Sequence, residues 1–217
     1  PKDSDIHLNL GMAYHGNDND KDAEVSFRQA TRLDERNGDA NRELAILLRA
    51  QGRLSEAFSA SSIAVANDAD NPVTNLVHGM VVFDLGGWDR AVPIFETILK
   101  DAPDNFEAIL YLGRSQLMLG SVDLAVQAFE KAVDLAPGHY EATRRLREAY
   151  AIMMPSWLGV MLGDRKRNNA YQAAIEKIVT PEDIVLDIGE STGSGLFPMM
   201  AARAGAKQVL TCESRPP

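Results

Sequence analysis

Small and aromatic residues recur along roughly the first 140 residues with a period of 34. The four registers begin at Ser4, Gly38, Pro72 and Phe106. In each register the eighth and twentieth positions hold glycine or alanine, and the twenty-fourth holds phenylalanine in three of the four. The residues are Gly11, Ala45, Gly79 and Gly113; then Ala23, Ala57, Ala91 and Ala125; then Phe27, Ser61, Phe95 and Phe129. Self-similarity at this period predicts an array of helical hairpins.

Physical chemistry explains the residue types. Two antiparallel helices approach closely where both carry small side chains, and the aromatic residue fills the space between one hairpin and the next. A glycine is expected to end the first helix, because it adopts left-handed backbone at little cost. The first register has Asp18 in its place. The turn glycines are Gly52, Gly86 and Gly120, and Pro103 and Pro137 are expected to stop the second helices of their repeats.

The pattern resembles the tetratricopeptide repeat. This resemblance implies a mostly α fold, a four-repeat α-solenoid with repeats near 4–37, 38–71, 72–105 and 106–139. Residues 140–154 then read as one more helix, with Leu146 and Tyr150 at its apolar positions and Pro155 at its end. A capping helix is expected there, because a stacked array otherwise leaves its last apolar face open.

The resemblance also implies a peptide groove on the first helices of the repeats. The lysine and asparagine set that clamps a peptide C-terminus in this family is missing. The groove is instead mostly apolar, with Arg42, Arg49 and Arg114 as candidate anion contacts. Capture of an apolar peptide and packing against the protein's own next domain remain equally open. The carried-over groove residues are Leu8, Met12, Arg42, Arg49, Leu76, Met80, Phe83, Leu110 and Arg114.

Residues 155–217 follow a different pattern. Asp164 is a good N-cap for a helix that carries Ala170, Tyr171, Ala174, Ile175 and Ile178 on one face. Residues 184–188 are a short apolar run typical of a buried parallel strand. A glycine-rich turn, a helix over 195–204 and a second strand over 208–212 follow. This order is the opening of a doubly wound sheet.

Several nucleotide-type cofactors suit such a sheet. A phosphate-cradling loop needs lysine and then serine or threonine after its last glycine, but Leu196 and Phe197 follow Gly195. An NTPase loop is therefore excluded, whereas a dinucleotide fold stays open. S-adenosylmethionine needs an acid at the end of the second strand, where Glu213 stands, and a cation for its carboxylate.

The stretch 161–175 supplies that cation and resembles the helix that folds over the cofactor in protein arginine N-methyltransferases. Together with Trp157 and the repeats, it is most similar to the arginine methyltransferase 9-like branch. The resemblance implies that Arg167 binds the cofactor carboxylate, that Met161 lines the active site and that Asp164 orders the helix. The catalytic glutamates are expected beyond residue 217. The implied cofactor-binding residues are Arg167, Asp187, Gly189, Gly193, Gly195 and Glu213.

The glycine turn departs from the family. The family has Gly-x-Gly-Thr-Gly followed by two leucines, whereas residues 189–196 read GESTGSGL. Either two extra residues lie within 190–192, or Ser191 occupies a required glycine. Leu158 also stands where relatives often have histidine. The region is therefore expected to be the incomplete start of a Rossmann-like α/β class I methyltransferase domain with an unusual turn, in an N-terminal fragment.

Charge and cysteine content narrow the expected partners. The net charge is −9, and residues 1–154 hold 15 Lys/Arg against 24 Asp/Glu, while 155–217 hold 7 against 7. Nucleic acid is an unfavourable partner for an acidic array. The acidic charge indicates either binding of basic polypeptides or simply a solvated helical surface. Neither a membrane span nor a signal peptide is visible. The single Cys212 favours a reducing compartment, and the cytoplasm is expected.

No metal site is predicted. Residues 18–22 begin like a calcium-binding loop, but the sixth and twelfth positions hold Ala23 and Gln29. Three functions remain in view. One is a protein arginine N-methyltransferase that uses S-adenosylmethionine and whose repeats recruit a protein or peptide substrate, which is expected to be Arg-rich. The second is a repeat scaffold with a degenerate, non-catalytic methyltransferase region. The third is a methyltransferase of the same fold that acts on another substrate, because the cofactor half says little about the acceptor.

Overall fold

The computed structural model describes residues 2–153, 156–189 and 195–213. The chain divides into two units, Pro1–Tyr150 and Ala151–Pro217. Within the described residues, no helix is both long enough and apolar enough to cross a membrane.

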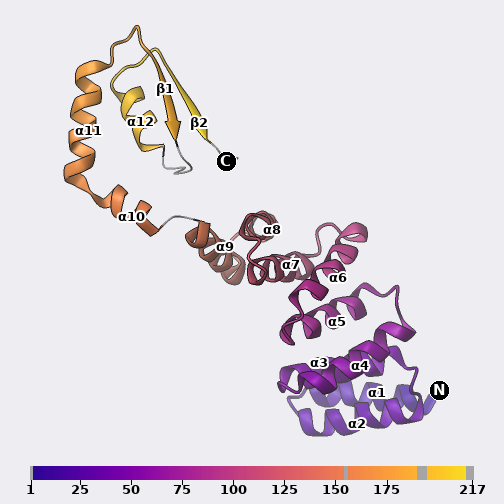
Figure 1. The fold of residues 1–217 in the computed structure, drawn as a ribbon. Helices are drawn as coiled ribbons and strands as arrows, with labels where there is room; N and C mark the ends of the chain where they lie inside the picture. Colours follow the sequence, from indigo (N-terminus) through magenta and orange to yellow (C-terminus); the bar gives the residue numbers. More distant parts are fainter. Residues whose placement is uncertain (1, 154–155, 190–194, 214–217) are drawn as a thin grey trace. The chain divides into compact units, whose positions relative to one another are not determined.

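The first unit is a row of helical hairpins that pack one on the next (Figure 1). Each predicted repeat contains one hairpin, and a further helix follows the fourth, so the solenoid is confirmed. The helices are α1 (Lys2–His15), α2 (Asp20–Leu33), α3 (Gly38–Ala50), α4 (Leu54–Asn67), α5 (Pro72–Asp84), α6 (Trp88–Asp101), α7 (Phe106–Met118), α8 (Val122–Leu135) and α9 (Tyr140–Met153).

Turn chemistry sets the helix boundaries. The turn glycines Gly52, Gly86 and Gly120 have φ values of 74°, 81° and 78°, and Asp18 takes the same left-handed region at 58°. The first repeat therefore keeps the hairpin despite its substitution. Three asparagines, 34 residues apart, accept hydrogen bonds from the backbone N–H groups that open α3, α5 and α7. These N-caps are Asn37, Asn71 and Asn105.

A glycine–phenylalanine contact fixes how closely the two helices of a repeat approach. A methyl group on Gly11 would lie 2.5 Å from the ring of Phe27, and one on Gly79 would lie 2.7 Å from that of Phe95. The fourth repeat has the same arrangement, with Gly113 against Phe129 at 2.6 Å. All three rings are at most 1% exposed. These distances are shorter than any real carbon contact, so only glycine fits opposite the ring.

The second repeat uses a different solution at the same two positions. Ala45 replaces the glycine, and the smaller Ser61 replaces the aromatic residue. The Ser61 hydroxyl bonds the Phe58 carbonyl at 3.1 Å and pairs with Nδ1 of His78 at 3.0 Å. The His78 ring also lies 5.5 Å from the ring of Phe58. The Ser61 hydroxyl and the His78 imidazole thus occupy space that a buried phenyl ring fills in the other repeats.

The helix after the fourth repeat is present, but the prediction of which residues pack it against the array is partly wrong. The buried residues of α9 are Ala142 and Ala149. Leu146 is half-buried, whereas Tyr150 is 42% exposed and donates its hydroxyl to Glu130 of α8. The packing of α9 thus depends on small residues, as does the close approach of the two helices within each repeat.

The second unit contains α10 (Ser156–Gly163), α11 (Arg165–Ile178), β1 (Ile184–Gly189), α12 (Leu196–Arg203) and β2 (Gln208–Glu213). The two strands are parallel, with Ile184 opposite Gln208 and Gly189 opposite Glu213. Helix α12 crosses between them and packs on both strands. The described part of the chain thus holds one strand–helix–strand unit, and a larger doubly wound sheet stays a prediction.

We predict that Gly79→Ala lowers the free energy of unfolding by about 1–3 kcal/mol, because the new methyl group overpacks against Phe95. Chemical denaturation measures the loss. Combining Gly79→Ala with Phe95→Leu should cost less than the sum of the two single changes. Strict additivity of the two changes would contradict the contact.

A second prediction concerns pH. Burial, together with the positive charge of Arg90, lowers the pKa of His78 below its ordinary 6.5 in the folded protein. The unfolded chain therefore binds this proton at a higher pH, so the stabilisation is present above 6.5 and is lost as pH falls below it. Urea unfolding between pH 7 and 5 should show a steeper loss of stability in the wild type than in His78→Gln. Parallel profiles would contradict this role.

Candidate functional site

The first helices of the repeats form one continuous surface, because α1, α3, α5 and α7 contact one another in succession. We call the exposed side of these four helices the inner surface. Every groove residue expected from the sequence lies on one of them. Leu8, Phe83 and Leu110 are less than a tenth exposed, so little of their surface is open to a ligand. Met12 is 48% exposed, and Arg42, Leu76 and Met80 are half-buried.

Arg49 links three helices of the inner surface, α3, α5 and α7. Its Nε donates to Asp84 at 2.5 Å, and one terminal nitrogen donates to the Tyr111 hydroxyl at 2.5 Å. The other terminal nitrogen lies 3.6 Å from the Met80 sulfur. Burial disfavours the charged guanidinium, but Tyr111 and Asp84 outweigh that cost and raise the pKa of Arg49. This cation is therefore already satisfied within the protein.

Arg114 lies in the same cluster, and among the residues that the structure describes it interacts only through its planar face. Its guanidinium carbon is 4.6 Å from the ring centroid of Phe83 and 4.5 Å from that of Tyr111. These two rings meet edge to face, with centroids 5.4 Å apart. Such stacking stabilises a cation without using its N–H donors. The third predicted arginine, Arg42, is instead paired with Asp39 and Glu43.

Sequence reasoning missed two members of this cluster, Asp84 and Tyr111. Both occupy repeat positions where the other three registers hold unrelated residues: Gly16, Ala50 and Met118 for Asp84, and Asn9, Glu43 and Val77 for Tyr111. A periodic pattern therefore gives no signal for either. The only clue is composition, namely a carboxylate and a phenol on helices that follow an arginine-bearing one.

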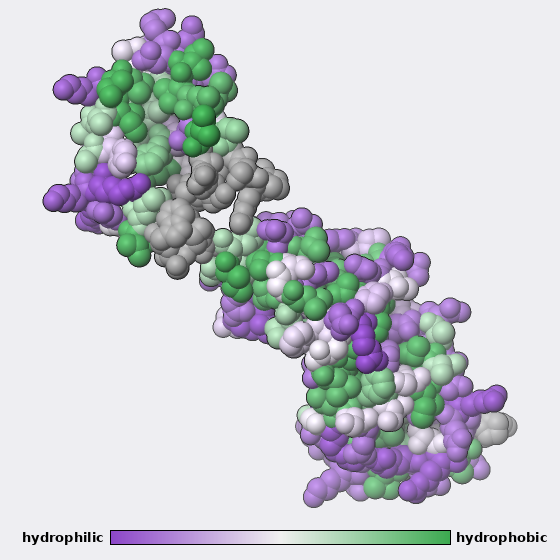
Figure 2. Space-filling view, viewed as in Figure 1, coloured by the Kyte–Doolittle hydropathy of each residue, from purple (hydrophilic) through white to green (hydrophobic). Residues whose placement is uncertain are grey.

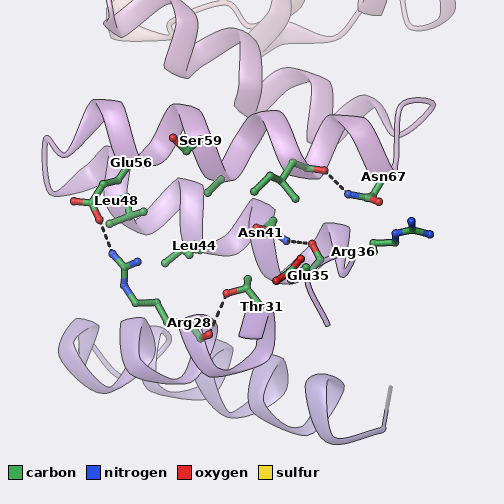
Figure 3. Close-up of a pocket in the computed structure, with 12 residues that line it drawn as sticks. Arg28, Thr31, Glu35, Arg36, Asn41, Leu44, Leu48, Glu56, Ser59 and Asn67 are labelled. Atoms are coloured by element: carbon green, nitrogen blue, oxygen red, sulfur yellow. Dashed lines mark hydrogen bonds and ion pairs between the residues drawn. The ribbon is translucent and has the colours of Figure 1, made fainter. Parts of the chain in front are cut away.

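The pockets on the described part of the first unit include two that bear on ligand binding. The larger, about 560 Å³, lies between α2, α3 and α4, above the buried side chains of Leu44 and Leu48. Figure 3 shows Arg28 reaching across it to Glu56, and their atoms lie 2.7 Å apart. The smaller pocket, about 300 Å³, is lined by residues of α5, α6, α7 and α9 and includes Phe83 and Arg114. Only the second pocket contains residues expected to line the groove.

In the second unit, Arg167 lies against the start of α12. Asp164 caps α11 by accepting from the Arg167 backbone N–H at 2.9 Å, as expected of an N-cap. The Arg167 guanidinium is 5.1 Å from the Tyr171 ring and 5.6 Å from that of Phe197, in the first turn of α12. It also donates to Asn168 at 3.2 Å. The cation is thus held beside the helix that follows the glycine turn.

The remaining expected cofactor residues lie along the strands and at the start of α12. Asp187 is on β1, Gly189 ends that strand opposite Glu213 on β2, and Gly195 precedes α12 with a φ of 56°. Gly193 and the rest of the turn, 190–194, lie outside the described residues. Met161 is half-buried in α10. Apolar side chains gather over the two strands, including the exposed Ile184, Leu186, Ile188 and Leu210 (Figure 2).

Comparison with known proteins identifies the array. The tetratricopeptide repeat family model matches residues 8–72 and 76–140, more than half of the chain. The chain belongs to the tetratricopeptide repeat family. Solved structures agree on the fold: "MamA 41-end from Desulfovibrio magneticus RS-1" has a TM-score of 0.64 at 16% identity, covering 70% of this chain and 85% of that one. The MamA AMB-1 C2221 structure gives 0.61 at 22%, covering 70% and 90%.

Curated relatives of this tetratricopeptide repeat protein are named arginine methyltransferases. The Arginine N(omega)-methyltransferase of Streptomyces achromogenes subsp. streptozoticus is 49% identical over 63 residues, 29% of this chain and 17% of that protein. Protein arginine N-methyltransferase 9 of Mus musculus is 45% identical over 62 residues, 28% and 7%. Protein arginine N-methyltransferase 7 of Drosophila grimshawi is 47% identical over 62, covering 26% and 8%. The match thus spans less than a fifth of each relative.

We predict that Arg49 and Asp84 are coupled by about 1 kcal/mol in a double-mutant cycle of unfolding free energies, because the pair is half-buried and also bonded to Tyr111. Arg42 and Asp39 offer a matched control: they are also 2.5 Å apart, but Asp39 is 56% exposed, and we expect below about 0.5 kcal/mol. Equal coupling energies in the two cycles would contradict the prediction that the half-buried Arg49–Asp84 pair is the stronger one.

Proposed function

We propose that this chain belongs to a protein arginine N-methyltransferase that uses S-adenosylmethionine and whose repeats recruit a protein or peptide substrate. Arginine methyltransferases share 45–49% identity with a segment of it, which supports the reaction class. The repeat array supports the recruitment role, since stacked repeats offer an extended binding surface. We further propose a cytoplasmic location, for which the single exposed thiol, Cys212, is the support.

The observation that carries the proposal is the position of Arg167 relative to the strand–helix–strand unit. Ligands of such sheets bind beyond the carboxyl ends of the strands. Gly189 and Glu213 end neighbouring parallel strands in register, and α12 begins at Leu196, directly after Gly195. Arg167 reaches the first turn of that helix by stacking on Phe197. The Arg167 guanidinium thus lies beside the start of α12, and the acidic residue Glu213 is the last residue of β2.

These residues suit S-adenosylmethionine. The planar guanidinium of Arg167 can grip both oxygens of a carboxylate, and Glu213 would accept hydrogen bonds from ribose hydroxyls. Asp187, Gly189, Gly193 and Gly195 would form the wall and floor of the binding site. When bound, the cofactor supplies an electrophilic methyl group for a guanidino nitrogen. The chain's contribution is orientation, which lowers the barrier by holding the reactants in place.

A scaffold is the second candidate function. The turn at 189–196 carries Glu190 and Ser191 where relatives have a compact glycine turn. A carboxylate there would repel that of the cofactor, and added side chains would fill its space. In this reading the repeats bind a partner and the second unit is not catalytic.

Cofactor binding separates the two functions. Isothermal titration of the full-length protein with S-adenosylmethionine should give a saturable curve, and Arg167→Ala should weaken binding about tenfold or more, as expected for a lost charged hydrogen bond. Arg167→Lys should fall between them, because an ammonium cannot grip two oxygens. Arg165→Ala, an exposed arginine on the same helix, should bind normally.

Circular dichroism should confirm that the variants fold. Unchanged affinity in Arg167→Ala would overturn the site assignment. Undetectable binding at millimolar cofactor would favour the scaffold, and transfer of methyl groups to an Arg-rich peptide would exclude it.

A further inference from the structure

The smaller pocket contains an arginine whose hydrogen-bonding capacity is unused. Within residues 2–153, 156–189 and 195–213, Arg114 has neither a hydrogen-bond nor an ion-pair partner; it contacts the rings of Phe83 and Tyr111 face-on. A guanidinium carries five N–H donors in its plane, and none is consumed by stacking. The rings therefore hold the cation in place while its edge stays free.

Arg49 lies in the same cluster, but its guanidinium has hydrogen-bond and ion-pair partners within the protein. It shares Tyr111 with Arg114, yet it also binds Asp84 and the Tyr111 hydroxyl at 2.5 Å each. Asp84 also lines the pocket, but its charge is already compensated by Arg49. The pocket's own carboxylate is thus occupied, and Arg114 still lacks an anion.

A second arginine and an apolar wall complete the pocket. Arg145 of α9 pairs with Glu148 at 3.2 Å, and its Nε is buried without a hydrogen bond, 3.6 Å from the nearest Glu141 oxygen. The wall consists of Trp88 and Leu117, both half-buried, and Met118, which is 50% exposed. A cavity of about 300 Å³ accommodates one or two side chains of a partner chain.

We propose that this pocket binds an acidic segment of a partner protein. A glutamate or aspartate side chain would lie on the free edge of Arg114, with Arg145 beside it. The adjoining apolar residue of that segment would pack on Trp88, Leu117 and Met118. The occupant is an internal side-chain carboxylate, because a peptide-terminus clamp of lysines and asparagines is absent from the sequence.

Charge complementarity decides against a basic occupant. Residues 1–154 carry nine more acidic than basic side chains, so the array as a whole attracts cations over long range. Inside the pocket, however, an incoming arginine or lysine would meet Arg114 and Arg145. At physiological ionic strength exposed charges are screened beyond about 8 Å, so contact groups govern what enters. An acidic segment is therefore selected locally, despite the surrounding field.

This inference deepens the recruitment part of the proposed function, and it separates two tasks. The repeats hold a partner by an acidic stretch, while the arginine that would be methylated lies elsewhere in that partner. Because the pocket belongs to the first unit and the proposed cofactor site to the second, loss of peptide binding leaves cofactor binding unchanged, and loss of cofactor binding leaves peptide binding unchanged.

The test uses two short peptides capped at both ends, which removes their terminal charges. One contains glutamate–leucine–glutamate flanked by glycine and serine, and the other has glutamine in place of each glutamate. Binding to the full-length protein is followed by calorimetry. The glutamate peptide should bind about tenfold or more tightly than its glutamine counterpart.

Arg114→Gln should remove that preference, and Arg114→Lys should restore part of it, since lysine keeps the charge but not the planar stacking. Arg147→Gln, which makes the same charge change at an exposed position of α9, should leave binding unchanged. Equal binding of the two peptides by the wild type would overturn the proposal whether or not any variant folds. So would an Arg114→Gln variant that folds and retains the preference, or a lysine-containing peptide that binds more tightly.

Discussion

The array depends on one steric constraint, the fit of a phenylalanine ring against a glycine within a hairpin. Because a methyl group at Gly79 would lie 2.7 Å from Phe95, the two helices stand closer than any other residue allows. That spacing positions each first helix against the next, and the inner surface follows from it. Arg49 of the second repeat meets Tyr111 of the fourth across the third repeat, whose hairpin is fixed by this contact.

Much of the fold could be predicted from the sequence. A period of 34 places small and aromatic residues, and turn glycines, at the positions the structure uses, so helix bounds were predictable to within a few residues. The N-cap asparagines repeat at the same interval and carry a further signal of the helix starts. The exposure of Tyr150 could not be predicted, because apolar spacing alone does not say whether a large residue or a neighbouring alanine makes the contact.

The candidate site was less predictable. Family positions indicated which helices form the inner surface and singled out Arg42, Arg49 and Arg114. They did not indicate which of these cations is paired within the protein. For Arg49 the pairing arises from Asp84 and Tyr111, which occur once each and follow no period. In the second unit, the order of the elements and the parallel direction of the strands were predictable, because the short apolar runs and the glycines between them have few other interpretations.

The reach of Arg49 changes how the array should unfold. Repeat proteins are usually treated as one-dimensional chains in which each unit is stabilised by its immediate neighbours. Arg49 belongs to the second repeat, yet it bonds Asp84 in the third and Tyr111 in the fourth. A nearest-neighbour description therefore needs an added second-neighbour energy. Because of this energy, unfolding of the fourth repeat also destabilises the second repeat. The second, third and fourth repeats are therefore expected to unfold together.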